Sequence, residues 1–362
     1  MKKILYCLII LNISCNQEPK VNYDNENCFE QKSADNKFHE FKPIEKSIIL
    51  KAKYPNLEIT EIKNPTKFDQ NYFGHTYSFK DVRNYDSPND FECLRKFKYQ
   101  NQDYFLAKNQ FGYWLIELLN KKEKPYFIGI AYDKYIHIKN SDKFPLIENG
   151  KIILEAAFIR QTDTEVILLS PPKYETIKDN LLIKIDLEKV KKDSDNDGFN
   201  DIFEEYIGLN PNSKDSDNDG VNDFGDSNPK YKSEKSDFTQ LYELLTSDLD
   251  YMDKFISNEE VNKHRKISNK NPFIFKVYYT DCNYFNSINP VNEKVIFISE
   301  KESDKPNFSV EEIHYSDQWS KIKKIGKNNF EISTYRHGAD ATFKIKNTNK
   351  GWKIEIISMS VV

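Results

Sequence analysis

Two acidic stretches divide this chain: Asp193-Ser-Asp-Asn-Asp-Gly-Phe-Asn-Asp-Ile-Phe-Glu204 and its near-copy Asp215-Ser-Asp-Asn-Asp-Gly-Val-Asn-Asp-Phe-Gly-Asp226. Apolar periodicity stops over residues 191–229, where Asp, Asn, Gly and Ser dominate. Strand-like alternation fills residues 41–190, and residues 230–362 combine a helical pattern with further alternation. We therefore expect a mixed fold, with a β-rich part, the acidic segment and an α+β part in this order.

The spacing within each stretch is that of a calcium-binding loop. Counted from its first aspartate, each has carboxylates at positions 1, 3, 5, 9 and 12 and a glycine at position 6. Ca²⁺ takes about six to eight oxygen ligands, and a twelve-residue loop of this pattern supplies them, position 7 through its backbone carbonyl. The predicted ligands of the first loop are Asp193, Asp195, Asp197, Phe199, Asp201 and Glu204. Those of the second loop are Asp215, Asp217, Asp219, Val221, Asp223 and Asp226.

Positions 7 and 8 indicate which kind of loop this is. A regular EF-hand has an aliphatic residue at position 8, where this chain has Asn200 and Asn222, with the apolar residue at position 7 instead. The segment between the loops reads as a short helix that ends at Gly208. Residues 191–229 thus resemble the thrombospondin type 3 calcium-binding repeats of bacterial surface proteins. The resemblance implies two bound Ca²⁺ ions, and the alternative is an acidic, solvated linker without an ion.

The calcium ions are expected to stabilise the fold. Without a cation, repulsion between the carboxylates favours disorder, so we expect calcium binding and folding to be coupled. The second loop closes with Asp226, a shorter arm than Glu204, so its site is expected to be weaker. Coordination can use every ligand of a loop. A structural clamp between the flanking parts is therefore the expected role, and a catalytic calcium is the alternative.

The N-terminus carries the features of an export signal. Two lysines precede an apolar run that is too short to span a bilayer, and Cys15 follows directly. Residues 1–14 resemble a bacterial lipoprotein signal, which implies acylation of Cys15, anchoring to the outer membrane or cell surface, and a flexible tether over 15–40. Asn12 stands where such signals usually have Leu. An ordinary cleaved secretory peptide with a free Cys15 is the alternative.

Three of the five cysteines lie beyond this signal and Cys15. An oxidising compartment allows disulfides, and Cys28 with Cys93 is the expected pair. Three buried thiols are the alternative.

The β-rich part is predicted from runs of alternating or continuous apolar residues between turn signals. The expected strands are Asp103–Ala107, Tyr113–Leu119, Tyr126–Tyr132, Tyr135–Lys139, Lys151–Ile159, Glu165–Ser170 and Leu181–Leu187. No βαβ alternation occurs, which favours a sheet or sandwich.

The C-terminal part is expected to be a long helix on an antiparallel sheet. Apolar residues recur at helical spacing from Phe238 to Ile256, with Ser236 as N-cap. A hairpin loop is expected at Asn347–Gly351. The expected strands are Phe273–Thr280, Lys294–Ser299, Phe330–Tyr335, Ala341–Lys346 and Trp352–Ser358.

The net charge and the motifs of the sequence limit the classes of function that we expect. The net charge is −4 and the few lysine runs, such as that from Lys321, read as solvated strand edges, so nucleic acid is not expected as a partner. None of the six histidines lies in a metalloprotease motif, and neither a nucleophile elbow nor a phosphate loop occurs. The expected function is a non-enzymatic, calcium-binding surface lipoprotein that binds a surface ligand or protein partner. The alternative is a secreted or surface hydrolase with structural calcium.

Overall fold

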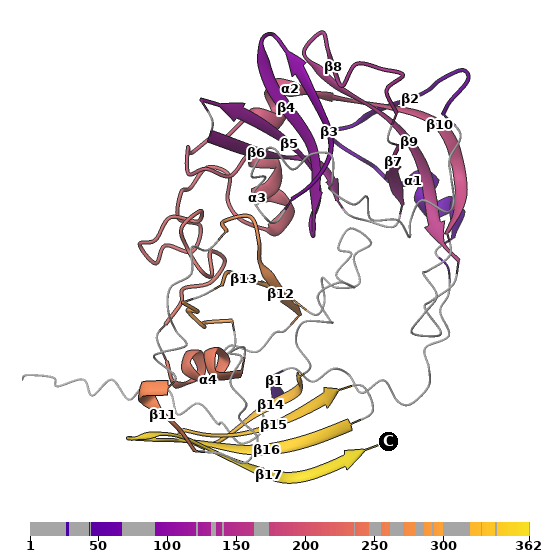
Figure 1. The fold of residues 1–362 in the computed structure, drawn as a ribbon. Coiled ribbons are helices and arrows are strands. Elements are labelled where there is room, and N and C mark those ends of the chain that lie inside the picture. Colours follow the sequence, from indigo (N-terminus) through magenta and orange to yellow (C-terminus); the bar gives the residue numbers. More distant parts are fainter. Residues whose placement is uncertain are drawn as a thin grey trace, which may run out of the picture.

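In the structure, a computed structural model, strands dominate the described residues and form four sheets there (Figure 1). Of the mixed fold expected, the presence of a β-rich part is thereby confirmed. No helix in the described part of the chain has the length and apolar character that a membrane crossing requires. The structure describes residues 27–28, 43, 45–66, 91–120, 122–131, 135–139, 141–162, 174–234, 236–245, 255–260, 271–279, 286–291, 293–299, 319–326, 328–336 and 339–361.

The first sheet is an antiparallel meander in the order β3-β4-β5-β6. Its strands are β3 (Glu92–Tyr99), β4 (Gln102–Asn109), β5 (Gly112–Leu119) and β6 (Lys122–Ala131). Gln100 and Asn101 both have positive φ between β3 and β4, as a two-residue hairpin turn requires.

The second sheet has the order β2-β10-β9-β7, and β8 also pairs with β9. The short helix α1 (Lys46–Lys51) packs beside it. Asn149 and Gly150, both at positive φ, turn the chain from β8 into β9. The strands are β2 (Glu58–Glu61), β7 (Ile136–Ile138), β8 (Ile147–Glu148), β9 (Lys151–Gln161) and β10 (Tyr174–Asp186).

All the expected strands of residues 41–190 that fall on described residues are present. The expected strand Glu165–Ser170 lies outside the described residues. The strands β2, β3 and β8 were not predicted. They are short, or they carry charged residues at many of their positions, so no apolar run marks them.

One short helix leads from the second sheet into the acidic segment, and a second lies within this segment. Helix α2 (Leu187–Lys191) follows β10, and Asp186 caps it by accepting a hydrogen bond from Lys189 N. Helix α3 (Asp201–Ile207) ends at Gly208, which has φ +82°. The predicted short helix and its glycine stop are therefore confirmed.

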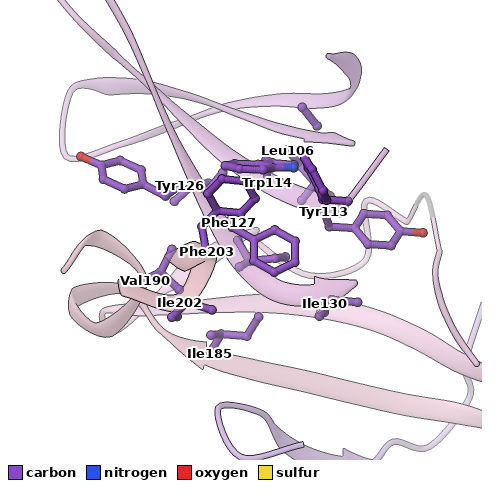
Figure 2. Close-up of a cluster of buried hydrophobic side chains, with 14 of the residues drawn as sticks. Leu106, Tyr113, Trp114, Tyr126, Phe127, Ile130, Ile185, Val190, Ile202 and Phe203 are labelled. Carbon is purple, nitrogen blue, oxygen red and sulfur yellow. The ribbon is translucent and has the colours of Figure 1, made fainter. Parts of the chain in front are cut away.

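One apolar core joins both sheets to these helices. Figure 2 shows Phe203 of α3 against Trp114 and Phe127, with Val190 of α2 nearby. The ring centroids of Trp114 and Phe203 are 4.8 Å apart, and both side chains are fully buried. Burying a large aromatic ring stabilises a fold by a few kcal/mol, on the order of 3. The acidic segment thus contributes to the core of the sheets that precede it.

The C-terminal sheet is antiparallel in the order β1-β14-β15-β16-β17-β11. Helix α4 (Asp237–Leu245) lies over one face of it (Figure 1), and Phe238 packs edge-on against Phe330 at 5.6 Å between centroids. Ser236 Oγ accepts a hydrogen bond from Thr239 N, as its predicted N-cap role requires. The strands are β1 (Asn27–Cys28), β11 (Phe255–Ser257), β14 (Trp319–Gly326), β15 (Asn329–Arg336), β16 (Ala339–Thr348) and β17 (Gly351–Val361).

The helix differs from its prediction. The described helix ends at Leu245, and Phe255 and Ile256, expected at its far end, lie in strand β11. Ile256 pairs with Trp352 of β17. Local periodicity does not reveal such a pairing with a distant strand.

A parallel pair, β12 (Lys276–Tyr279) and β13 (Val295–Ile298), stands apart from the antiparallel sheet in which both strands were expected. Its side chains alternate between two cores. Val277, Ile296 and Ile298 belong to the core of the first two sheets. Tyr278, Val295 and Phe297 belong to the core beneath α4. The pair therefore lies between the two cores and contributes side chains to both.

The expected disulfide is wrong. Cys93 of β3 is a free thiol, and burial raises its pKa. Cys28 lies in β1, which pairs with β14 in the C-terminal sheet. The two cysteines therefore belong to different sheets.

Candidate metal centre

The two acidic loops share one backbone conformation. Asp201 N donates to Lys192 O at 2.9 Å in the first loop, and Asp223 N donates to Lys214 O at 2.8 Å in the second. Asn196 and Asn218 both have φ +61°, and the glycine at position 6 has positive φ in both loops. The repeat seen in the sequence is thus a repeat of structure.

Serines at position 2 hold the aspartates at position 9. Ser194 donates to Asp201 through its backbone N (2.7 Å) and its Oγ (2.8 Å). Ser216 donates to Asp223 in the same way, at 2.9 and 2.6 Å. The prediction overlooked these serines, although the identical Ser after the first Asp of each loop was a readable signal.

The carboxylates gather in three groups, in each of which the possible ligand atoms lie within 4.8 Å of one another. Two groups are those expected from the loops, Asp193 with Asp195 and Asp197, and Asp215 with Asp217 and Asp219. The third consists of Asp197, Glu204 and Asp223, and so takes residues from both loops.

Local turns orient these side chains. One oxygen of Asp195 accepts a hydrogen bond from Asp197 N, and one oxygen of Asp197 accepts from Phe199 N. Asp217 accepts from Asp219 N in the second loop. The other oxygen of each of these aspartates is buried and has no hydrogen-bond partner among the described residues. One oxygen thus holds the side chain and leaves the second available to a ligand.

Among the described residues, the carboxylate of Glu204 lacks the hydrogen bonds that the other buried candidate ligands accept. Its side chain is fully buried, and neither of its oxygens has a hydrogen-bond partner in the described structure. A buried carboxylate without partners costs several kcal/mol in free energy, on the order of 5, unless it is neutralised. Hard divalent cations bind such oxygens. The donor set therefore fits Ca²⁺.

The raised pKa values of the buried carboxylates also favour a bound cation. Burial raises the pKa of Glu204 to about 9, and the charges of Asp197 and Asp195 contribute to this rise. Burial also raises the pKa of Asp197 and of Asp223 to about 6 in each case. These groups resist ionisation in the protein alone, and a bound cation would reverse that preference.

Two of the predicted carboxylate ligands, Asp201 and Asp226, lie outside the three groups. Burial opposes ionisation of Asp201, but hydrogen bonds from Lys192 and Ser194 outweigh it and lower the pKa. Lys192 Nζ lies 2.7 Å from Asp201 Oδ2. Asp226 is buried, with one oxygen bonded to Asn228 N and the other without a partner in the described part of the chain.

The residues at position 7, predicted to bind through their carbonyls, have different surroundings. Phe199 is 1 % exposed and belongs to the aromatic core. Val221 is 44 % exposed. Position 7 of the first loop is therefore packed into the core, whereas position 7 of the second loop reaches the surface.

Asn200, at position 8, fastens the first loop to strand β6. Its Oδ1 accepts from Phe127 N at 3.1 Å, and its Nδ2 donates to Phe127 O (2.9 Å) and Val190 O (2.8 Å). The equivalent Asn222 instead accepts from Gly225 N within its own loop.

Lys294 fastens the second loop to the parallel pair. Its buried Nζ donates to the carbonyl oxygens of Asp223 (3.0 Å) and Phe224 (2.8 Å). It also lies over the rings of Phe199 and Phe275, at 5.0 and 4.8 Å from their centroids. Val295 N donates to Ser227 O at 2.7 Å. The acidic segment therefore contacts the first two sheets at one end and β13 at the other.

Of the six histidines, the structure describes His137. Burial lowers its pKa to about 4, and the charges of Lys108 and Lys139 contribute; it is half-buried between the core residues Ile136 and Ile138 of β7. The others, His39, His75, His264, His314 and His337, lie outside the described residues.

Comparisons with known proteins give no match: no family model fits the chain, and no curated protein or solved structure shows significant similarity to it.

Proposed function

We propose that residues 191–229 form a calcium-binding segment of the thrombospondin type 3 kind, with one Ca²⁺ in each loop. One observation carries this proposal, the full burial of Glu204 with both oxygens unpartnered among the described residues. An acidic linker in solvent would expose such a group. The similar conformation of the second loop extends the proposal to Asp215–Asp226.

We propose further that the calcium is structural and clamps a β-rich domain (41–190) to an α+β domain (230–362). The contacts of Asn200 with β6 and of Lys294 with the second loop support this role. Asp197, Phe199 and Glu204 of the first loop are buried, which limits the access of a substrate to this part of the loop. A binding or adhesion role through the flanking sheets is therefore favoured, and turnover of model esters, peptides or glycosides would instead favour a hydrolase.

The N-terminal signal supports export and a lipid anchor. We propose that Cys15, which lies outside the described residues, is acylated and holds the chain on the outer membrane or cell surface. A Cys15→Ser chain expressed in a bacterium should shift from the membrane fraction to the soluble fraction. A wild-type chain that is already soluble would argue for an ordinary secretory peptide.

Calorimetric titration with Ca²⁺ tests the central proposal. The wild-type chain should bind with a Kd on the order of 10⁻⁴–10⁻³ M, as extracellular calcium modules do. The double variant Asp195→Ala/Asp217→Ala should lose most of this heat. Asp142→Ala, which removes a carboxylate with a 93 % exposed side chain far from the loops in sequence, is the matched control and should titrate as wild type. Absence of heat from the wild type at millimolar calcium would refute the proposal.

A further inference from the structure

We infer that the outer face of the C-terminal sheet, which carries Lys344, Lys346 and Lys353, binds an anionic lipid surface. Helix α4 lies over the opposite face (Figure 1), where Phe330 and Trp352 are buried in the core beneath it. Side chains alternate between the two faces along each strand, so the neighbours of these core residues belong to the outer face. The inference rests on the proposed lipid anchor, because the anchor brings this sheet to a membrane.

The pairing register places lysines from three strands on the outer face. Residues directly opposite each other on neighbouring strands lie on the same face of a sheet. One row of such partners crosses four strands and consists of Lys323, Glu331, Lys344 and Glu355. The next row crosses three strands and consists of Lys346, Lys353 and Phe255. The outer face is therefore assembled from residues that are far apart in the sequence.

The two rows carry an excess of positive charge. They contain four lysines and two glutamates, a net charge of +2, whereas the whole chain has a net charge of −4. Lys344, Lys346 and Lys353 are all exposed. Lys353 pairs with Glu355, and Lys344 and Lys346 also help to lower the pKa of this glutamate. One glutamate thus stands among three exposed lysines, so this part of the face attracts anions.

Exposed apolar side chains accompany the lysines. Phe255 lies opposite Lys353 and is 53 % exposed. Further along β17, Ile357 and Met359 are each 54 % exposed. Lysines together with exposed apolar side chains are typical of surfaces that lie on anionic membranes, where the apolar groups enter the headgroup layer. A soluble polyanion would need the lysines alone, so the exposed Phe255 favours a lipid surface.

The chain between Cys15 and this sheet is short. Strand β1 begins at Asn27 and pairs with β14, where Asn27 lies opposite Lys323 at the end of the first row. Asn27 follows Cys15 by twelve residues. A fully extended chain of this length spans about 40 Å, so an acylated Cys15 would keep this edge of the sheet within about 40 Å of the bilayer.

Vesicle co-sedimentation of the soluble Cys15→Ser chain tests the outer face without the anchor. At low salt and constant millimolar calcium, vesicles with about one-third phosphatidylglycerol should bind this chain at least about fivefold more tightly than vesicles of phosphatidylcholine alone. High salt should remove the difference. Adding Lys344→Gln/Lys346→Gln/Lys353→Gln to the chain should abolish most of the preference for anionic vesicles.

A matched control removes the same charge elsewhere. Lys51, Lys53 and Lys98 are exposed lysines outside this sheet, and Lys51→Gln/Lys53→Gln/Lys98→Gln should bind as the Cys15→Ser parent does. Equal losses in the two triple variants, or a parent without preference for anionic vesicles, would overturn the inference. Either result would leave the calcium proposal and the fractionation test of Cys15 in place.

Two further arms separate lipid from other polyanions. Binding of the parent to dextran sulfate without binding to anionic vesicles would overturn the inference in favour of a soluble polyanion. Phe255→Ser, which keeps every lysine, should weaken vesicle binding and leave binding to dextran sulfate unchanged. If the triple variant of the outer face does not fold, unchanged vesicle binding by Phe255→Ser would overturn the lipid assignment.

Discussion

Asn200 and Asn222 occupy the same position of two similar loops but hold different parts of the molecule together. Asn200 is buried and bonds to backbone groups of Phe127 and Val190, whereas Asn222 bonds mainly within its own loop. Repeat position therefore does not determine the role of a side chain in this segment. The side chain's role follows from the surface against which each loop is packed.

The two asparagines make a matched pair for a stability measurement. Asn200→Ala would leave Phe127 N, Phe127 O and Val190 O without their partner, so we expect a loss of about 3 kcal/mol in the free energy of unfolding. Asn222→Ala should cost less than about 1 kcal/mol. Urea unfolding at saturating calcium measures both. Equal losses would mean that Asn200 does not fasten the loop to β6.

At the scale of elements, the sequence predicts those helices and strands whose formation depends on neighbouring residues. The strands β4, β5 and β9 are dense in apolar and aromatic residues, and α3 has its glycine stop, so local rules suffice for them. The lysine run from Lys321, expected at a solvated strand edge, lies in β14, whose outer neighbour is the two-residue strand β1.

Elements defined by distant partners could not be predicted in the same way. Phe255 and Ile256 continue a helical spacing of apolar residues, yet they pair with Lys353 and Trp352 of β17. The parallel pairing of β12 with β13 depends on the two cores that enclose it. Neither core is visible in a window of neighbouring residues.

In the candidate metal centre too, the features that depend on neighbouring residues are predicted and those that depend on distant residues are not. The groups within each loop follow from counting along a twelve-residue motif. The group of Asp197, Glu204 and Asp223 depends on how closely the loops pack, which the count does not contain. Sequence reasoning therefore found every member of this group but not its grouping.

At the scale of the whole molecule, removal of calcium should loosen the segment and part of one core. Phe199 and Phe203 lie within the first loop and its helix, and both are buried in the core of the first two sheets. With a chelator, we expect hydrogen exchange to rise by at least about tenfold over residues 193–226. Mass spectrometry of peptides locates the change.

Two controls accompany this measurement, one in the other core and one in a variant chain. Strands β15 and β16 belong to the other core and should keep their protection. The Asp195→Ala/Asp217→Ala chain should exchange at the raised rate without a chelator. Unchanged exchange over 193–226 in the wild type would contradict a folding role for the ion.

The parallel pair β12–β13 has a consequence for how this chain can be shortened for expression. A fragment that stops at residue 229 would lack Val277, Ile296 and Ile298, and with them one side of the first core. It would also lack the ammonium of Lys294, which bonds to the end of the second loop. Such a fragment would expose a contiguous apolar face and tend to aggregate. A shorter chain that is to stay soluble must therefore keep β12 and β13 together with the acidic segment.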